Sequence, residues 1–281
     1  MYVNIPVAIS PLTFHLLPLF PAVVSSPSSS NSQHAPGSAQ VRALIHLGAN
    51  ACIIGRNDEK TRAAAVDLAT ARQGAKVIGI GNVDVRKISD LEDAAARCVR
   101  ELGSLDFCIA GAAGNFLAPI SQLSANAFKT VMDIDVLGSY NTLKATVPYL
   151  VKSAAKCKSD GITPSSAGTG GRIIFVSATL HYGGTPLQAH VMSAKAGVDA
   201  LSSSVAIEYG PLGLTSNIIA PGPISGTEGM KRLAAQGAEA KAARGIPSGR
   251  YGRVKEIADA TVWLFSDAAN FVVSIQQSVM S

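Results

Sequence analysis

The order of apolar and polar residues changes at about Ala39, and from there the chain follows a regular alternation. Short apolar runs, the form of strands buried on both faces of a sheet, alternate with longer segments whose apolar residues recur at helical spacing. The runs predict strands at residues 51–55, 76–85, 105–111, 172–179 and 215–223. The longer segments predict helices at residues 39–48, 59–74, 88–103, 126–155, 187–210 and 254–270. This alternation is typical of βαβ units, so we expect an α/β fold with a doubly wound parallel sheet.

Residues 1–38 have a different character. Residues 3–26 are mostly apolar but are interrupted by Pro6, Pro11, Pro18 and Pro21, which argues against a membrane-spanning helix. A secretory signal would normally open with positive charge, which is missing here. The stretch SSPSSSNSQHAPGS that follows is of low complexity. We therefore expect an irregular segment at residues 1–38 and one α/β domain at residues 39–281.

Composition and charge narrow the possible functions. The chain has 281 residues, of which 47% are apolar and 15% charged, as in globular proteins. The net charge is +5, but the basic residues are scattered and only 5% of residues are aromatic, which disfavours a nucleic-acid surface. An enzyme with phosphate-bearing ligands fits better. The four cysteines show neither metal-ligand spacing nor a disulfide framework, so we expect reduced thiols and no bound metal.

Several motifs resemble the short-chain dehydrogenase/reductase family, whose sheet is Rossmann-like. They are AGAAGNFLAP, NAFKTVMDIDVLGSYN, SAKAGVDAL and APGPISGTEGMKRL, and the similarity runs from about Ala39 to Phe271. The motifs AAGNF and APGPISGTEG together are similar to the dienoyl-CoA reductases of this family. The resemblance implies NADPH-dependent reduction of a 2,4-dienoyl-CoA to an enoyl-CoA during oxidation of unsaturated fatty acids. Two alternatives stay open: a catalytically dead remnant of that enzyme, and a related trans-enoyl-CoA reductase.

The resemblance also indicates that the fold is incomplete at both ends. The family opens with a strand and a glycine-rich turn, and no such turn occurs in the first 48 residues. It closes with a further strand, where this chain has FVVSIQQSVMS. We expect a truncated gene model, with a divergent isoform as the alternative. The missing first strand would be central, and the local substitutes VNIPVAIS and FPAVVSS contain proline, so we expect neither to fit well.

The family's catalytic positions are largely replaced. Its serine, tyrosine and asparagine fall on Ala178, Val191 and Asp135, and only the lysine, Lys195, is kept. Reduction of a dienoyl thioester ends with proton transfer to carbon, which a positioned water can perform. Asp199 lies four residues after Lys195 on the same helix face, and such a pair can hold a water.

Each of these residues also has a purely structural interpretation. Lys195 and Asp199 could form an ordinary helical salt bridge, and Asp135 could be a buried carboxylate whose natural partner is Lys195. His190 and Tyr182 are second-line proton donors, since neither occupies the tyrosine position.

The cofactor residues follow the strand ends. Arg56 ends its strand where an acidic residue would favour NAD, so it predicts recognition of the 2′-phosphate of NADPH. By resemblance Lys195 contacts the nicotinamide ribose. The remaining expected cofactor residues are Asn57, Asp84, Gly111, Pro221, Gly222, Pro223, Ile224 and Thr227.

The resemblance implies a fatty acyl-CoA thioester as substrate and a homo-oligomeric enzyme. The expected substrate-binding residues are Arg86, Phe116, Ser124, Asn126 and Arg232, and each could equally be surface or loop packing. We expect no nucleic-acid partner and no membrane span. Peroxisomal residence is implied by the family, but the chain ends VMS and not in a carboxy-terminal peroxisomal signal, so the cytoplasm is the alternative.

Overall fold

One parallel sheet of seven strands forms the centre of the molecule. The computed structural model describes residues 22–25, 36–158, 160, 162, 168–227, 229–230, 243–274 and 276–279. Within these residues the strand order is β3-β2-β1-β4-β5-β6-β7, and every neighbouring pair is parallel. The strands are β1 (Ala22–Ser25), β2 (Ala51–Ile54), β3 (Val77–Ile80), β4 (Phe107–Ala110), β5 (Arg172–Val176), β6 (Thr215–Pro221) and β7 (Gln276–Val279). The predicted doubly wound α/β architecture is confirmed.

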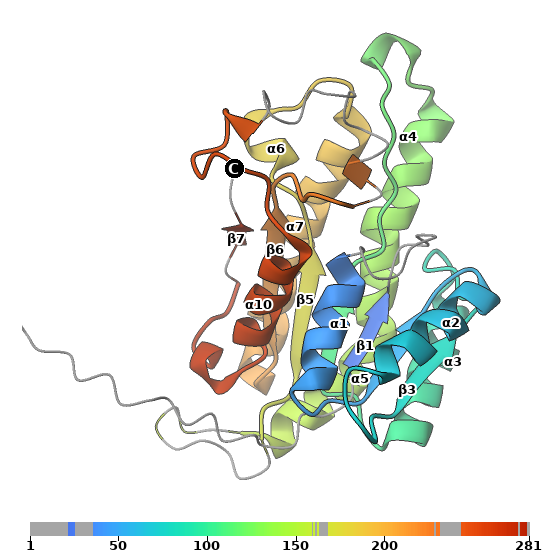
Figure 1. The fold of residues 1–281 in the computed structure, drawn as a ribbon, viewed down its shortest axis with the longest axis vertical. Helices are drawn as coiled ribbons and strands as arrows, with labels where there is room; N and C mark the ends of the chain where they lie inside the picture. Colours follow the sequence, from blue (N-terminus) through green and yellow to red (C-terminus); the bar gives the residue numbers. More distant parts are fainter. Residues whose placement is uncertain are drawn as a thin grey trace, which may run out of the picture.

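Helices cover both faces of the sheet (Figure 1). They are α1 (Pro36–His46), α2 (Asp58–Ala69), α3 (Ile88–Leu102), α4 (Ala125–Met132), α5 (Gly138–Lys156), α6 (Leu180–Gly183), α7 (Ala189–Tyr209) and α10 (Val254–Leu264). Three short 3-10 turns add η2 (Ile120–Gln122), η4 (Gly210–Leu212) and η5 (Asp267–Ala269). None of the helices in the described part of the chain is both long and apolar enough to cross a membrane.

Alternate strand residues feed two separate cores, because successive side chains of a strand point to opposite faces. Cys52, Cys108 and Phe175 pack with α3, α5 and α7 on one face. Ile53 and Phe107 pack with α1, α2 and α10 on the other. α1 and α10 lie side by side there (Figure 1), and Gln40 Nε2 donates to Thr261 Oγ1 at 2.7 Å in their interface.

The expectation of an incomplete sheet was wrong at both ends. β1 occupies the central slot and pairs with β2 and β4, with Val24 opposite Ile53 on one side and Ile109 on the other. A strand of four residues is enough, and Ala22–Ser25 fits between Pro21 and Pro27 without containing a proline. At the other end β7 pairs with β6.

The segment expected to be irregular, residues 1–38, therefore contains β1 and the start of α1. Residues 26–35, which connect them, contain no glycine and lie outside the described residues. The glycine-rich turn that the family carries after its first strand is therefore absent from the sequence between β1 and α1.

The long helix expected at residues 126–155 is also interrupted. After α4 the backbone makes a π-helical turn, η3 (Asp133–Leu137), before α5 continues. A π turn widens the helix and is often found at functional sites. Here it contains Asp135.

Candidate active site

The π-helical turn places Asp135 in the interior at the carboxyl end of the sheet. Its side chain is fully buried. Oδ1 accepts the backbone N–H of Gly114 at 2.7 Å, and Oδ2 lies 3.1 Å from Nζ of Lys195. Lys195 also donates to the carbonyl of Val176, the last residue of β5, at 3.0 Å. The expected pairing of Asp135 with Lys195 is therefore present, and it joins η3, β5 and α7.

Asp199 lies one helical turn after Lys195 on α7 and is also buried. Its Oδ2 lies 2.8 Å from Nε2 of His181 and accepts the hydroxyl of Tyr182 at 3.0 Å. Lys195 and Asp199, which were expected to act as a pair, each also have an ion-pair partner on another element. Burial and the Asp199 charge raise the pKa of Tyr182 to about 12, so its hydroxyl stays protonated.

The position of the family's tyrosine is apolar. Val191 is buried in a cluster with Val131 and Ala194. Ala178, at the serine position, has no hydroxyl either. Neither side chain can donate a proton, so any proton must come from another group or from water.

The loop after β4 is fastened to the start of α7. Asn115 Nδ2 donates to Gln188 Oε1 at 2.7 Å, and the N–H of Ala118 donates to the carbonyl of Leu187 at 2.9 Å. Phe116 stacks on His190 with ring centroids 4.1 Å apart. Burial lowers the pKa of His190, so this ring favours its neutral form. Leu187 has a φ of 66°, an unusual conformation for a residue with a side chain and one that is often found at functional sites.

The expected adenosine-binding residues lie beyond the ends of β2 and β3. Arg56 is exposed, and Asn57 caps α2 by accepting the N–H of Lys60 at 2.8 Å. Asp84 binds Arg86 with both carboxylate oxygens, and this contact holds the pKa of Asp84 at about 2. The positive charge of Arg56 contributes in the same direction. Arg86, expected on the substrate side, is therefore paired with a residue expected on the cofactor side.

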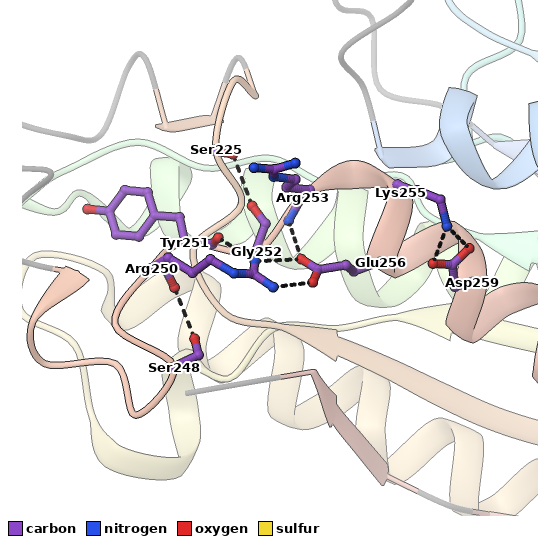
Figure 2. Close-up of polar contacts among 9 residues, drawn as sticks. All are labelled: Ser225, Ser248, Arg250, Tyr251, Gly252, Arg253, Lys255, Glu256 and Asp259. Atoms are coloured by element: carbon purple, nitrogen blue, oxygen red, sulfur yellow. Dashed lines mark hydrogen bonds and ion pairs between the residues drawn. The ribbon is translucent and has the colours of Figure 1, made fainter.

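The segment after β6 is pinned to the start of α10 (Figure 2). The N–H of Ser225 donates to the carbonyl of Gly252 at 2.9 Å, and the N–H of Gly252 donates to Pro223 at 3.0 Å. Glu256 holds this arrangement by accepting Arg250 and the backbone N–H of Arg253 (Figure 2). A Cβ on residue 252 would lie 2.7 Å from Cδ1 of Ile224, so a side chain at this position would displace the end of the Ile224 side chain.

The other expected residues are spread along the same edge. Gly111 follows β4 directly, Pro221 ends β6 with Gly222 after it, and Thr227 donates to the carbonyl of Ile224 at 2.9 Å.

The residues expected to bind substrate are only partly brought together. Ser124 caps α4 by accepting the N–H of Ala127 at 3.2 Å, and Asn126 is exposed in the first turn of that helix. Phe116 is part of the stack with His190. Arg232 lies outside the described residues. Their roles toward a ligand stay predictions.

Sequence reasoning missed His181, which contacts Asp199, and the Asn115–Gln188 bond. His181 and Tyr182 come shortly after a buried strand, and the carboxyl ends of parallel strands carry the ligand site in such folds. The presence of a histidine and a tyrosine just after this strand could have indicated that they belong to the site.

The chain was compared with known proteins. A family model described as enoyl-(acyl carrier protein) reductase matches residues 33–279. The peroxisomal 2,4-dienoyl-CoA reductase of Saccharomyces cerevisiae, described as (3E)-enoyl-CoA-producing, is 47% identical over 83% of this chain and 75% of that protein. The corresponding protein of Danio rerio is 41% identical over 82% of this chain and 71% of that protein.

Solved structures agree on the fold. A short chain dehydrogenase from Bacillus anthracis is 26% identical, with a TM-score of 0.73 over 92% of this chain and 94% of that one. Levodione reductase is 21% identical, with a TM-score of 0.80 over 94% of this chain and 96% of that one. On these matches the chain belongs to the short-chain dehydrogenase/reductase family.

Proposed function

We propose that this chain uses NADPH to reduce 2,4-dienoyl-CoA thioesters to (3E)-enoyl-CoA, the reduction for which its relatives from yeast and zebrafish are named. The observation that carries the proposal is the replacement of the hydroxyl donors around Lys195. Val191 and Ala178 cannot donate protons. Two carboxylates are buried near the lysine instead: Asp135 on η3 lies 3.1 Å from its ammonium, and Asp199 follows one turn later on α7. Such a site suits proton transfer to carbon through water.

The reaction balances as one hydride and one proton added to the diene. When bound, the nicotinamide supplies the hydride to C5 of the thioester. The charge then spreads over C4, C2 and the thioester oxygen, and a proton on C2 leaves the remaining double bond between C3 and C4. The protein must therefore deliver one proton to a carbon atom and exclude other proton sources.

Lys195 and Asp199 have the contacts required for this role. A lysine ammonium has three hydrogens. One is donated to the carbonyl of Val176, and Asp135 lies 3.1 Å away as an ion-pair partner, so the ammonium can still donate to the nicotinamide ribose or to a water. Asp199, one turn further along α7, is held as an acceptor by His181 and Tyr182. A water between the lysine and this carboxylate would be polarised and oriented for proton transfer.

The residues beyond β2 and β3 fit the adenosine end of a nicotinamide dinucleotide, the cofactor type of this family. An exposed arginine at the end of β2 suits a 2′-phosphate, and Arg56 is in that position. Asp84 remains ionised beside it. We assign NADPH on this basis. We place the enzyme in the peroxisome by similarity to the named relatives, and in the oxidation of unsaturated fatty acids because a 2,4-dienoyl-CoA is the proposed substrate.

An assay with three thioesters tests the function. NADPH consumption is followed with 2,4-hexadienoyl-CoA, 2-hexenoyl-CoA and a saturated control. We expect turnover with the diene only, and an Asp199→Asn variant should lose about 100-fold in turnover while its NADPH affinity changes less than about threefold. Turnover of 2-hexenoyl-CoA alone would favour an enoyl reductase. Failure of the native chain to bind NADPH would favour a catalytically dead protein.

A further inference from the structure

The short helix α6 directs two polar side chains onto one oxygen of Asp199. Nε2 of His181 and the hydroxyl of Tyr182 both reach Oδ2, at 2.8 and 3.0 Å. Their rings contact each other edge to face, with centroids 4.2 Å apart. The His181 side chain is only 13% exposed and that of Asp199 only 7%, so the interaction is shielded from solvent.

The protonation states follow from the hydrogen bonds. Tyr182 keeps its proton, and a hydroxyl facing a carboxylate oxygen can only donate to it. The same oxygen must then receive an N–H from His181, which places a hydrogen on Nε2. Nδ1 of His181 is buried and has no hydrogen-bond partner within the described residues. At least two donors, His181 and Tyr182, therefore hold Asp199 in a fixed position.

Lys195 and Asp199 lie on the same helix, but each is bound by residues of other elements. A lysine and an aspartate four residues apart on a helix are neighbours and can pair directly. Here Asp135 and the Val176 carbonyl compete for Lys195, while His181 and Tyr182 compete for Asp199. These partners come from η3 and β5 on one side and from α6 on the other.

We propose that His181 and Tyr182 are positioning residues that hold Asp199 away from direct pairing with Lys195, so that one water can lie between the two charges. This inference rests on the proposed function, because that water is the one that protonates C2. Without the α6 donors, the carboxylate would turn toward Lys195 and displace the water. Hydride transfer would stay intact while proton transfer would become slow.

Four variants separate this role from a general loss of structure. His181→Leu removes the donor at similar volume, and His181→Gln restores an N–H near the Nε2 position. Tyr182→Phe removes one hydroxyl from a half-exposed ring. Tyr140→Phe is the matched control, since Tyr140 on α5 is exposed to the same degree, 44% against 43%. Circular dichroism and NADPH binding check that each variant is folded.

The readout is a pair of isotope effects on dienoyl-CoA turnover, one from deuterated solvent and one from NADPH deuterated at the transferred position. We expect turnover to fall about tenfold in His181→Leu and in Tyr182→Phe, the scale of one hydrogen bond to a charged group. The solvent effect should rise and the hydride effect should fall in both. His181→Gln should recover most of the turnover, and Tyr140→Phe should match the native enzyme.

Two different failures can be told apart. Unchanged isotope effects in an active His181→Leu variant would overturn the positioning role and leave the reductase function standing. A native enzyme that does not reduce the diene would overturn the function and, with it, the role assigned to α6. Nitrogen NMR of the imidazole rings adds a check that needs no activity, and the five histidines of the chain allow assignment by substitution. A hydrogen on Nδ1 instead of Nε2 of His181 would contradict the inferred hydrogen bond.

Discussion

Asp135 is fully buried, so the effect of its charge on the stability of the fold depends on the groups that pair with it. Asp135→Asn keeps an acceptor for the Gly114 N–H but leaves the Lys195 ammonium without its carboxylate. Breaking a buried pair in this way costs about 3–5 kcal/mol. We expect the free energy of unfolding, measured in urea, to fall by that amount. Asp133→Asn is the control in the same turn, because its partner Lys129 is 70% exposed and such pairs contribute at most about 1 kcal/mol. An equal fall in the free energy of unfolding in both variants would show that the buried ion pair of Asp135 contributes no more than the exposed pair of Asp133.

We expect the side chain of Arg56 to determine whether the protein prefers NADPH or NADH. Arg56→Asp removes the proposed partner of the 2′-phosphate and adds an acceptor for a ribose hydroxyl. The ratio of kcat/KM for NADPH to that for NADH should fall by about 100-fold or more, since a charge-assisted bond is lost and a repulsion gained. Arg100→Asp makes the same charge change in the last turn of α3 and should leave the ratio as it was. An unchanged ratio in Arg56→Asp would remove the basis for assigning NADPH.

At the scale of elements, β1 is the piece on which the sheet depends. A proline at Val24 would remove a backbone N–H from a strand that has neighbours on both sides. We expect Val24→Pro to lower the free energy of unfolding by at least about 3 kcal/mol, the scale of proline in a hydrogen-bonded interior. Ala125→Pro is the control, because it opens α4 after Ser124, whose extended backbone accepts a following proline. Similar stability of Val24→Pro and the native chain would mean that β1 does not hold the sheet together.

The same strand shows where sequence reasoning reached its limit. Apolar runs such as Ala51–Ile54 and Phe107–Ala110 were found because they are buried on both faces and lie between clear helices. FPAVVSS, which contains β1, was named as a substitute strand but was expected to fit poorly because of its proline, although the four residues of β1 contain none. The π-helical turn η3 could not be predicted, since one extra residue in a turn leaves the apolar pattern around it almost unchanged.

At the scale of the whole molecule, the location of the candidate site could be predicted from the sequence, but some of its side-chain contacts could not. Parallel strands direct the loops that follow them to one edge, so Arg56, Asp84 and Pro221 could be placed together from the sequence. The Asp135–Lys195 pair was also expected, because a buried charge needs a partner. The Asp199–His181 contact was missed, because it depends on a four-residue helix that carries too little periodicity to be recognised.

Two carboxylates, Asp84 beyond β3 and Glu256 in the first turn of α10, make the stability of the whole fold depend on pH. Hydrogen bonds from Arg86 and Arg250 hold the pKa values of Asp84 and Glu256 at about 2, well below their ordinary values. Between those values and about pH 4.5 the unfolded chain binds more protons than the folded one, so stability rises with pH. We therefore expect the free energy of unfolding, measured in urea from pH 2.5 to 6, to fall as the pH drops through this range. Glu256→Gln should flatten part of that slope, while Asp259→Asn, which removes an exposed carboxylate paired with Lys255, should keep it. A slope that Glu256→Gln leaves unchanged would show that the clamp between the segment after β6 and α10 does not contribute to acid sensitivity.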